Sequence, residues 1–139
     1  MEELNIIFST EYFQLRKVQK QIQNYLRENL YNSFEAFIGI NEILINSFEH
    51  ANQFDPAKNL KVKIHITERK LIVKIEDEGN GFCWGEKISK DFSVEEILRV
   101  NKNQERGRGL MIASEVFDLI KFNQKGNKVF LHKMIVSHK

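Results

Sequence analysis

Apolar residues recur along this chain with two different periods, and each change of period marks a new element. Leu4 to Phe8 is a short apolar run with β-branched residues, which predicts a strand. Steps of three and four residues follow and predict an amphipathic helix of about five turns, capped by Ser9 or Thr10 ahead of Glu11. A second helix is expected from about Phe34 to Gln53, with apolar residues on more than half of its circumference.

After the turn around Pro56 the pattern changes to one that predicts strands. Residues 61–67 (KVKIHIT) alternate apolar and polar side chains, and residues 70–77 (KLIVKIED) follow after a short connection, which predicts a hairpin with one covered face. Residues 118–122 and 128–136 form a second hairpin, joined at Lys125-Gly126-Asn127. Ahead of that hairpin, Leu110 to Phe117 has the spacing of a helix.

Between the two hairpins, the segment from Cys83 to Arg106 is polar and mostly irregular. Ser93-x-x-Glu96 is a capping box, which predicts a short helix through Val100. The whole segment is about 24 residues long, more than a plain connection needs, so we expect a lid over a site.

The order of these elements, β-α-α-β-β-lid-α-β-β, predicts the fold class. Antiparallel hairpins interrupted by helices favour an α+β two-layer sandwich, with one mixed, mostly antiparallel sheet covered on one face by helices. A doubly wound parallel sheet is not expected. No internal repeat or Pro/Gly/Ser linker divides the sequence, so residues 1–139 are expected to form a single domain.

Composition excludes several classes of protein. The chain carries 21 Lys and Arg against 19 Asp and Glu with no long run of either sign, so neither a nucleic-acid arm nor an acidic tail is predicted. The single cysteine, Cys83, cannot form an internal disulfide or a zinc site by itself. The N-terminus lacks the pattern of a signal peptide, and no apolar run is long enough for a membrane span. We therefore expect a cytoplasmic protein with no direct role on nucleic acid or a membrane.

Polar residues on the second helix form the first candidate for chemistry. Glu42 and Asn46 stand four residues apart and therefore share one helix face. A carboxylate there can act as a general base, and an amide oxygen suits one position of an octahedral Mg²⁺ completed by phosphates and water. Taken alone, the pair is also typical of a solvated helix face.

The second candidate is the glycine-containing stretch IEDEGNGF. It places Asp77 at the end of an apolar strand, ahead of Gly79 and Gly81. Glycine lets the backbone approach a flat ligand, and the carboxylate can accept a hydrogen bond from an exocyclic amine such as N6 of adenine. A plain turn explains this motif equally well when it stands alone.

The third candidate is ERGRGLMIA, with Gly107 and Gly109 expected immediately before a helix. Free amides and the positive end of a helix dipole bind anions, and Arg106 and Arg108 add charge that suits phosphate. An ordinary glycine-rich helix entry with two solvated arginines is the alternative.

The three motifs in this order resemble the N, G1 and G2 boxes of the GHKL ATP-binding family, which includes gyrase and histidine-kinase ATPase domains. The resemblance implies the histidine-kinase-like ATPase fold (Bergerat fold), with ATP and Mg²⁺ as cofactors. It makes Glu42 the catalytic base and Asn46 the Mg²⁺ ligand. The residues that it implies in nucleotide binding are Asn46, Asp77, Gly79, Gly81, Arg106, Gly107, Arg108, Gly109 and Leu110.

The spacing Glu42-x-x-x-Asn46-x-x-x-His50, the run from Gly107 to Leu110 and the closing GNKVFLHK further resemble the anti-sigma factor serine/threonine kinases of bacterial partner switches. This resemblance implies transfer of phosphate to an anti-anti-sigma (STAS) protein, sequestration of a sigma factor, and a homodimer. One alternative is a nucleotide-gated sequestering protein without phosphotransfer. Another is a stand-alone relative of a histidine-kinase ATPase domain, although no phospho-acceptor histidine helix precedes the motifs. Glu42 favours the kinase.

Overall fold

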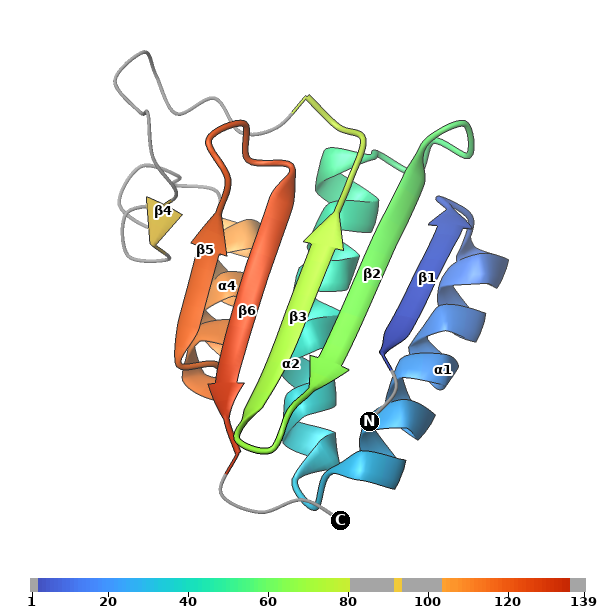
Figure 1. The fold of residues 1–139 in the computed structure, drawn as a ribbon. Helices are drawn as coiled ribbons and strands as arrows, with labels where there is room; N and C mark the ends of the chain where they lie inside the picture. Colours follow the sequence, from blue (N-terminus) through green and yellow to red (C-terminus); the bar gives the residue numbers. More distant parts are fainter. Residues whose placement is uncertain (1–2, 81–91, 94–103, 136–139) are drawn as a thin grey trace.

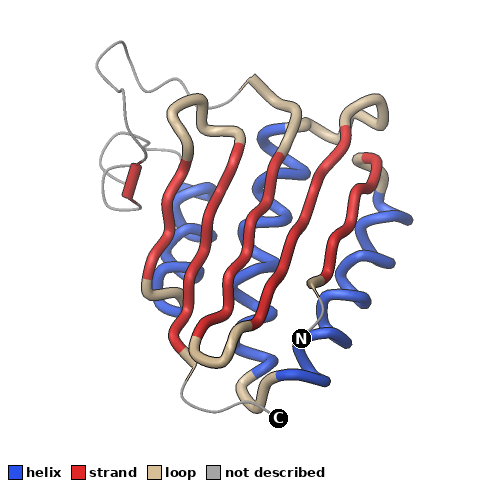
Figure 2. Tube along the Cα trace, in the orientation of Figure 1, coloured by secondary structure: helices blue, strands red, loops and turns tan. Residues whose placement is uncertain are grey.

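The computed structural model describes residues 3–80, 92–93 and 104–135 of the 139-residue chain. Its strands form one sheet in the order β1-β2-β3-β6-β5-β4, and helices α1, α2 and α4 all lie on the same face of that sheet (Figures 1 and 2). The predicted two-layer α+β sandwich is confirmed. The sheet was predicted to be mixed, but every strand pairing in the described residues is antiparallel.

The elements have the following bounds. The strands are β1 (Leu4–Ser9), β2 (Asn59–Ile66), β3 (Lys70–Glu76), β4 (Phe92–Ser93), β5 (Leu119–Phe122) and β6 (Lys128–Met134). The helices are α1 (Tyr12–Asn29), α2 (Ser33–Asn46), the π-helical turn η1 (Ser47–Ala51) and α4 (Gln104–Val116). No helix in the described part of the chain is both long and apolar enough to cross a membrane.

The alternation of the sequence decides which side of each strand is covered. Leu60, Val62, Ile64 and Ile66 of β2 are buried toward the helices, while the intervening Lys61 and Lys63 are exposed on the other face. The neighbouring strand β3 follows the same rule, with Val73 buried opposite Ile64. Each fully buried aliphatic side chain stabilises the fold by about 1.5–3 kcal/mol, so this pattern fixes the register of the sheet.

The helices complete the core from one side. The buried residues of α1 are Leu15, Val18, Ile22 and Leu26, at the predicted three- and four-residue steps. Ile40, Ile43 and Leu44 of α2 are also buried, because α2 lies between the sheet and the neighbouring helices. Burial raises the pKa of the Tyr25 hydroxyl on α1 above its ordinary value.

Three local predictions differ from the structure. Glu11, not Ser9 or Thr10, precedes the first residue of α1, and no side chain caps that helix, because the Thr10 hydroxyl donates to the Lys58 carbonyl at 2.7 Å. The second helix changes from α to π geometry after Asn46. The helix predicted from Leu110 begins at Gln104, six residues earlier than expected. Most of the predicted lid, and the short helix predicted after Ser93, lie outside the described residues.

Candidate functional site

A small pocket lies at the end of the sheet where β3 finishes and β6 begins. Its lining residues are Ile43, Asn46, Ser47, Asp77, Leu110, Phe122, Gly126 and Val129. Three of them, Asn46, Asp77 and Leu110, come from the three separate sequence motifs. The fold therefore brings parts of all three motifs to one place, as the combined interpretation of these motifs requires.

Asp77 supplies the carboxylate of the pocket. Only 4% of its surface is exposed, and the Gly79 amide donates to its Oδ1 at 2.9 Å. Its own backbone amide donates to the Asn127 carbonyl at 2.9 Å, which ties the end of β3 to the start of β6. A buried carboxylate needs such partners because its desolvation is otherwise costly. Beside the apolar Val129 and Phe122, a carboxylate held in this way is suited to read the amine edge of a flat heterocycle.

Gly79 is required by a contact within the chain. A Cβ on this residue would lie 2.5 Å from the Ala51 carbonyl oxygen, so the segment after β3 packs directly on the backbone at the end of η1. Sequence analysis predicted that Gly79 would approach an adenine base. The structure gives a different reason for the glycine, and Gly81 lies outside the described residues.

Glu42 and Asn46 converge on Gly109 of α4. A Cβ on Gly109 would lie 3.1 Å from Glu42 Oε2 and 3.1 Å from Asn46 Nδ2, so both polar side chains of α2 end at the same point on the neighbouring helix. The absence of a side chain at Gly109 leaves room for the two polar groups. This arrangement places a potential base next to a potential Mg²⁺ ligand.

The structure overturns the predicted glycine-rich helix entry. Gly107 and Gly109 lie inside α4, which begins at Gln104. A backbone amide as far along as Gly109 donates within its own helix and is not free to bind an anion. Arg108 is exposed and Leu110 is 2% exposed against the pocket, while the side chain of Arg106 lies outside the described set. Gly109 therefore contributes by allowing α2 and α4 to approach each other closely.

Asn52 is a residue of this region that sequence analysis missed. It is fully buried, and its Nδ2 donates to the Thr10 hydroxyl and to the Asn59 carbonyl, both at 3.0 Å. Its Oδ1 accepts the Glu78 amide at 2.9 Å. One side chain thus joins the end of β1, the start of β2 and the segment that carries Asp77. The only sequence signal was a polar cluster around Pro56, which is typical of a plain turn.

The π-helical turn η1 places Asn52 for these contacts. The Asn52 amide donates to the Ser47 carbonyl, five residues earlier, at 2.9 Å. One such turn rotates all following residues relative to an uninterrupted α-helix, and π-turns are frequent at functional sites. Here the turn follows Asn46 directly and separates the site residues of α2 from the anchor at Asn52.

The donor set fits magnesium only together with phosphate. No group of three or more His, Cys, Asp or Glu side chains in the described part of the chain could hold a metal ion. Mg²⁺ commonly takes one or two protein oxygens and completes its octahedron with water and nucleotide phosphates. The side-chain oxygen of Asn46 suits that limited role, and an all-protein metal site is not present among the described residues.

Comparison with known proteins agrees with this geometry. A family model described as a histidine kinase-like ATPase domain matches residues 8–133. That range includes the Asp77 pocket, Glu42 and Asn46 on α2, and Gly109 on α4. A search of curated proteins found no match.

Proposed function

This chain belongs to the family of histidine kinase-like ATPase domains, and from that premise we propose that it is an anti-sigma-type serine/threonine kinase. Family membership implies ATP binding and an ATP-using domain of the GHKL type. The finer proposal is that the γ-phosphoryl group of ATP passes to a serine or threonine of a small STAS-like anti-anti-sigma protein. The observation that carries it is the convergence of Glu42 and Asn46 beside Gly109, next to the pocket of Asp77.

We assign ATP binding to two groups of residues. Asp77 accepts a hydrogen bond from N6 of adenine, while Val129, Phe122 and Ile43 provide apolar walls for the ring. Asn46 supplies a protein oxygen to the magnesium ion that accompanies the phosphates. Magnesium supplies charge neutralisation during transfer, as it does in other phosphoryl-transfer enzymes.

Glu42 is proposed as the general base. The hydroxyl oxygen of the protein substrate bonds to the γ-phosphorus, and the bond from phosphorus to the bridging oxygen of ADP breaks. The hydroxyl proton passes to the Glu42 carboxylate. Phosphoryl transfer depends mainly on positioning and charge stabilisation, so one base beside one metal ligand is a sufficient set of protein groups.

The partners belong to the same proposal. The Glu42-x-x-x-Asn46-x-x-x-His50 spacing and the closing GNKVFLHK resemble the anti-sigma factor kinases. On that resemblance rests the proposal of a cytoplasmic homodimer that alternates between a sigma factor and the STAS protein. The rival function is a nucleotide-gated protein that sequesters its partner without phosphorylating it. Both functions need ATP, so only the chemical step separates them.

Two substitutions test the assignment. Glu42→Gln keeps the shape of the side chain but removes the base, so ATP binding should persist while phosphate transfer falls about 10²–10⁴-fold. Asn46→Ala removes a metal ligand, so it should weaken the Mg²⁺-dependent part of ATP binding as well as the transfer. Calorimetry with and without Mg²⁺ measures binding, and γ-labelled ATP with the cell's STAS-domain proteins measures transfer.

Asn24→Ala is the matched control, because Asn24 is exposed on α1, away from the pocket. Transfer at the wild-type rate by Glu42→Gln would remove Glu42 as the base. A wild-type protein that holds a sigma factor in an ATP-dependent complex, yet labels no STAS protein, would establish the sequestering function instead.

A further inference from the structure

The second face of the sheet has no covering layer in the described structure. The helices all lie on the opposite face, and the strands present a broad uncovered surface (Figures 1 and 2). Ile7 of β1 is 66% exposed there and Met134 of β6 is 53% exposed. An antiparallel sheet can leave one face to water, and single exposed apolar side chains on such a face are common, so the charge on this face decides whether a partner is expected.

Charge is strongly segregated onto this open face. The strand register places six lysines on it among the described residues: Lys61, Lys63, Lys70, Lys74, Lys121 and Lys128. The carboxylates that accompany them in the described structure are Glu3 and Glu76. The whole chain has a formal net charge of only +2, so the excess of cations belongs to this face.

The two carboxylates neutralise only part of that excess. Glu3 lies 3.6 Å from Lys63 and Glu76 lies 3.8 Å from Lys128. No ion pair involves Lys61 or Lys74 among the described residues. Lys61 is exposed, and the half-buried Lys74 lies over the Phe130 ring, with its Nζ 6.0 Å from the ring centroid. Cations without a neutralising carboxylate produce a positive potential that attracts a negatively charged surface.

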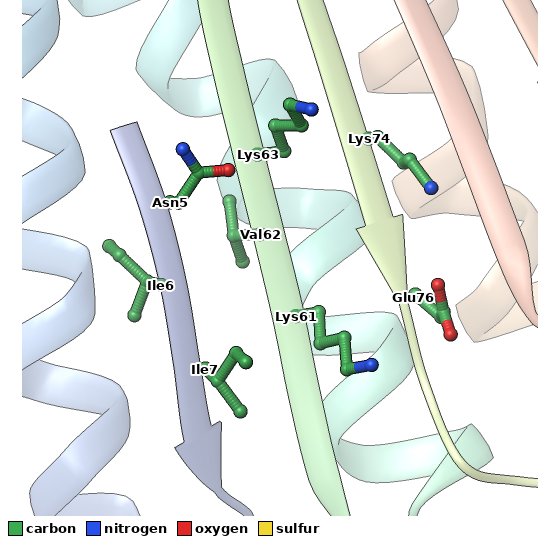
Figure 3. Close-up of a pocket in the computed structure, with 8 residues that line it drawn as sticks. All are labelled: Asn5, Ile6, Ile7, Lys61, Val62, Lys63, Lys74 and Glu76. Atoms are coloured by element: carbon green, nitrogen blue, oxygen red, sulfur yellow. The ribbon is translucent and has the colours of Figure 1, made fainter. Parts of the chain in front are cut away.

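A hollow of about 170 Å³ lies over β1, β2 and β3, next to three of these lysines (Figure 3). Its lining residues are Asn5, Ile6 and Ile7 of β1, Lys61, Val62 and Lys63 of β2, and Lys74 and Glu76 of β3. Three lysines and one carboxylate therefore border it. Its volume is below the about 300–1,000 Å³ of small-molecule sites, and its lining is largely apolar. These properties suit a single apolar side chain better than a cofactor.

We propose that the open sheet face is a docking surface for an acidic segment of another protein. Carboxylates of that segment meet Lys61 and Lys74, and one of its aliphatic side chains enters the hollow beside Ile7. The surface lies on the opposite side of the sheet from α2 and α4, so a docked segment leaves the Asp77 pocket accessible. This inference goes beyond the proposed kinase function and does not depend on it.

Other occupants fit the face less well. Single-stranded nucleic acids dock on basic surfaces that carry several aromatic stacking platforms, and Phe130 is the one Phe, Tyr or Trp side chain on the described open face. A second copy of the chain, packed face to face, would bring one set of lysines against another. An acidic apolar segment satisfies both the charge and the exposed aliphatic groups.

A designed peptide tests the surface in the full-length protein. The probe is a short fluorescein-labelled peptide that alternates Glu and Leu, and the paired control alternates Lys and Leu. Fluorescence anisotropy should show binding of the Glu–Leu peptide alone, and added salt should weaken it. Lys61→Glu with Lys74→Glu should reduce its affinity about tenfold or more. Ile7→Asp should also weaken binding, because it places a charge at the mouth of the hollow.

Lys20→Glu is the matched control, because Lys20 is exposed on α1 in the helical layer. It should leave peptide affinity unchanged, and all variants should retain wild-type ATP affinity, which shows that the fold is intact. Equal binding of both peptides, or no effect of the Lys61 and Lys74 changes, would overturn the proposal. Tighter binding of single-stranded DNA or of anionic lipid vesicles would also overturn it. A dimer that dissociates on introduction of Lys61→Glu and Lys74→Glu would overturn the proposal as well.

Discussion

At the scale of the residue, Gly109 matters because of the space that it leaves. Its position inside α4 gives it no benefit as a helix former, since glycine costs about 1 kcal/mol there relative to alanine. The benefit lies in the contact with α2, where Glu42 and Asn46 reach its surface. Stability and site geometry therefore favour different residues at this position.

Gly109→Ala should separate these two effects. Thermal stability should remain equal to wild type or rise, because alanine favours the helix. Phosphate transfer should fall, because the new methyl group displaces Glu42 Oε2 and Asn46 Nδ2, each only 3.1 Å away. A thermal melt and the labelled-ATP assay measure the two properties on one sample.

Gly39→Ala provides the contrast within the same pair of helices. Its Cβ would meet the Phe117 ring at 2.8 Å and Val116 at 3.0 Å, so it should lower the melting temperature. Should Gly109→Ala prove fully active, the close approach of α4 would have no part in holding the site residues.

At the scale of the element, the end of the second helix is attached through one side chain. Asn52 joins β1, β2 and the Glu78 backbone from a fully buried position after η1. Asn52→Ala should lower the free energy of unfolding by about 1–3 kcal/mol, because buried partners lose their hydrogen bonds. It should also weaken ATP binding, since Asp77 directly precedes Glu78.

Urea unfolding measures the first effect and calorimetry the second, with Asn24→Ala as the exposed control. A variant that loses stability but binds ATP with unchanged affinity would limit Asn52 to a purely structural role.

Sequence periodicity predicted the regular elements because burial of one face imposes it. The alternation of Val62, Ile64 and Ile66 predicted the central hairpin for that reason. The π-turn at Ser47 was not predictable, because the five residues of η1 at the end of the helix are too few to show a change of period in the sequence. The early start of α4 was missed because two glycines argue against a helix, and packing against α2 overrides that local preference.

The site was predictable to the extent that its chemistry lies in short motifs. The structure places Asn46 and Asp77 in one pocket and brings Glu42 and Asn46 together at Gly109. The pocket walls at Phe122 and Val129 were not distinguished from core, since an apolar side chain has the same pattern in both places. Thr10 and Asn52 resembled a helix cap and a turn, because their long-range hydrogen bonds leave no local signal.

At the scale of the whole molecule, the sheet and its helices together decide which nucleotide fits. We expect ATP and ADP to bind and GTP to bind far more weakly, because a guanine presents an oxygen where adenine presents N6, and Asp77 cannot donate to it. Calorimetry with the three nucleotides measures the difference. Comparable affinity for GTP would remove Asp77 as the reader of the base.

The order of the sheet also has a consequence for how the chain folds. The β2–β3 and β5–β6 pairs are local hairpins, whereas β3 and β6 meet only after the long segment between them has been closed into a loop. Asp77 and Asn127 face each other across that late seam. On a ribosome, a nascent chain that has not yet released β6 can therefore have finished the β2–β3 hairpin but has no nucleotide pocket. ATP can bind only to chains in which β6 has already been synthesised and paired with β3.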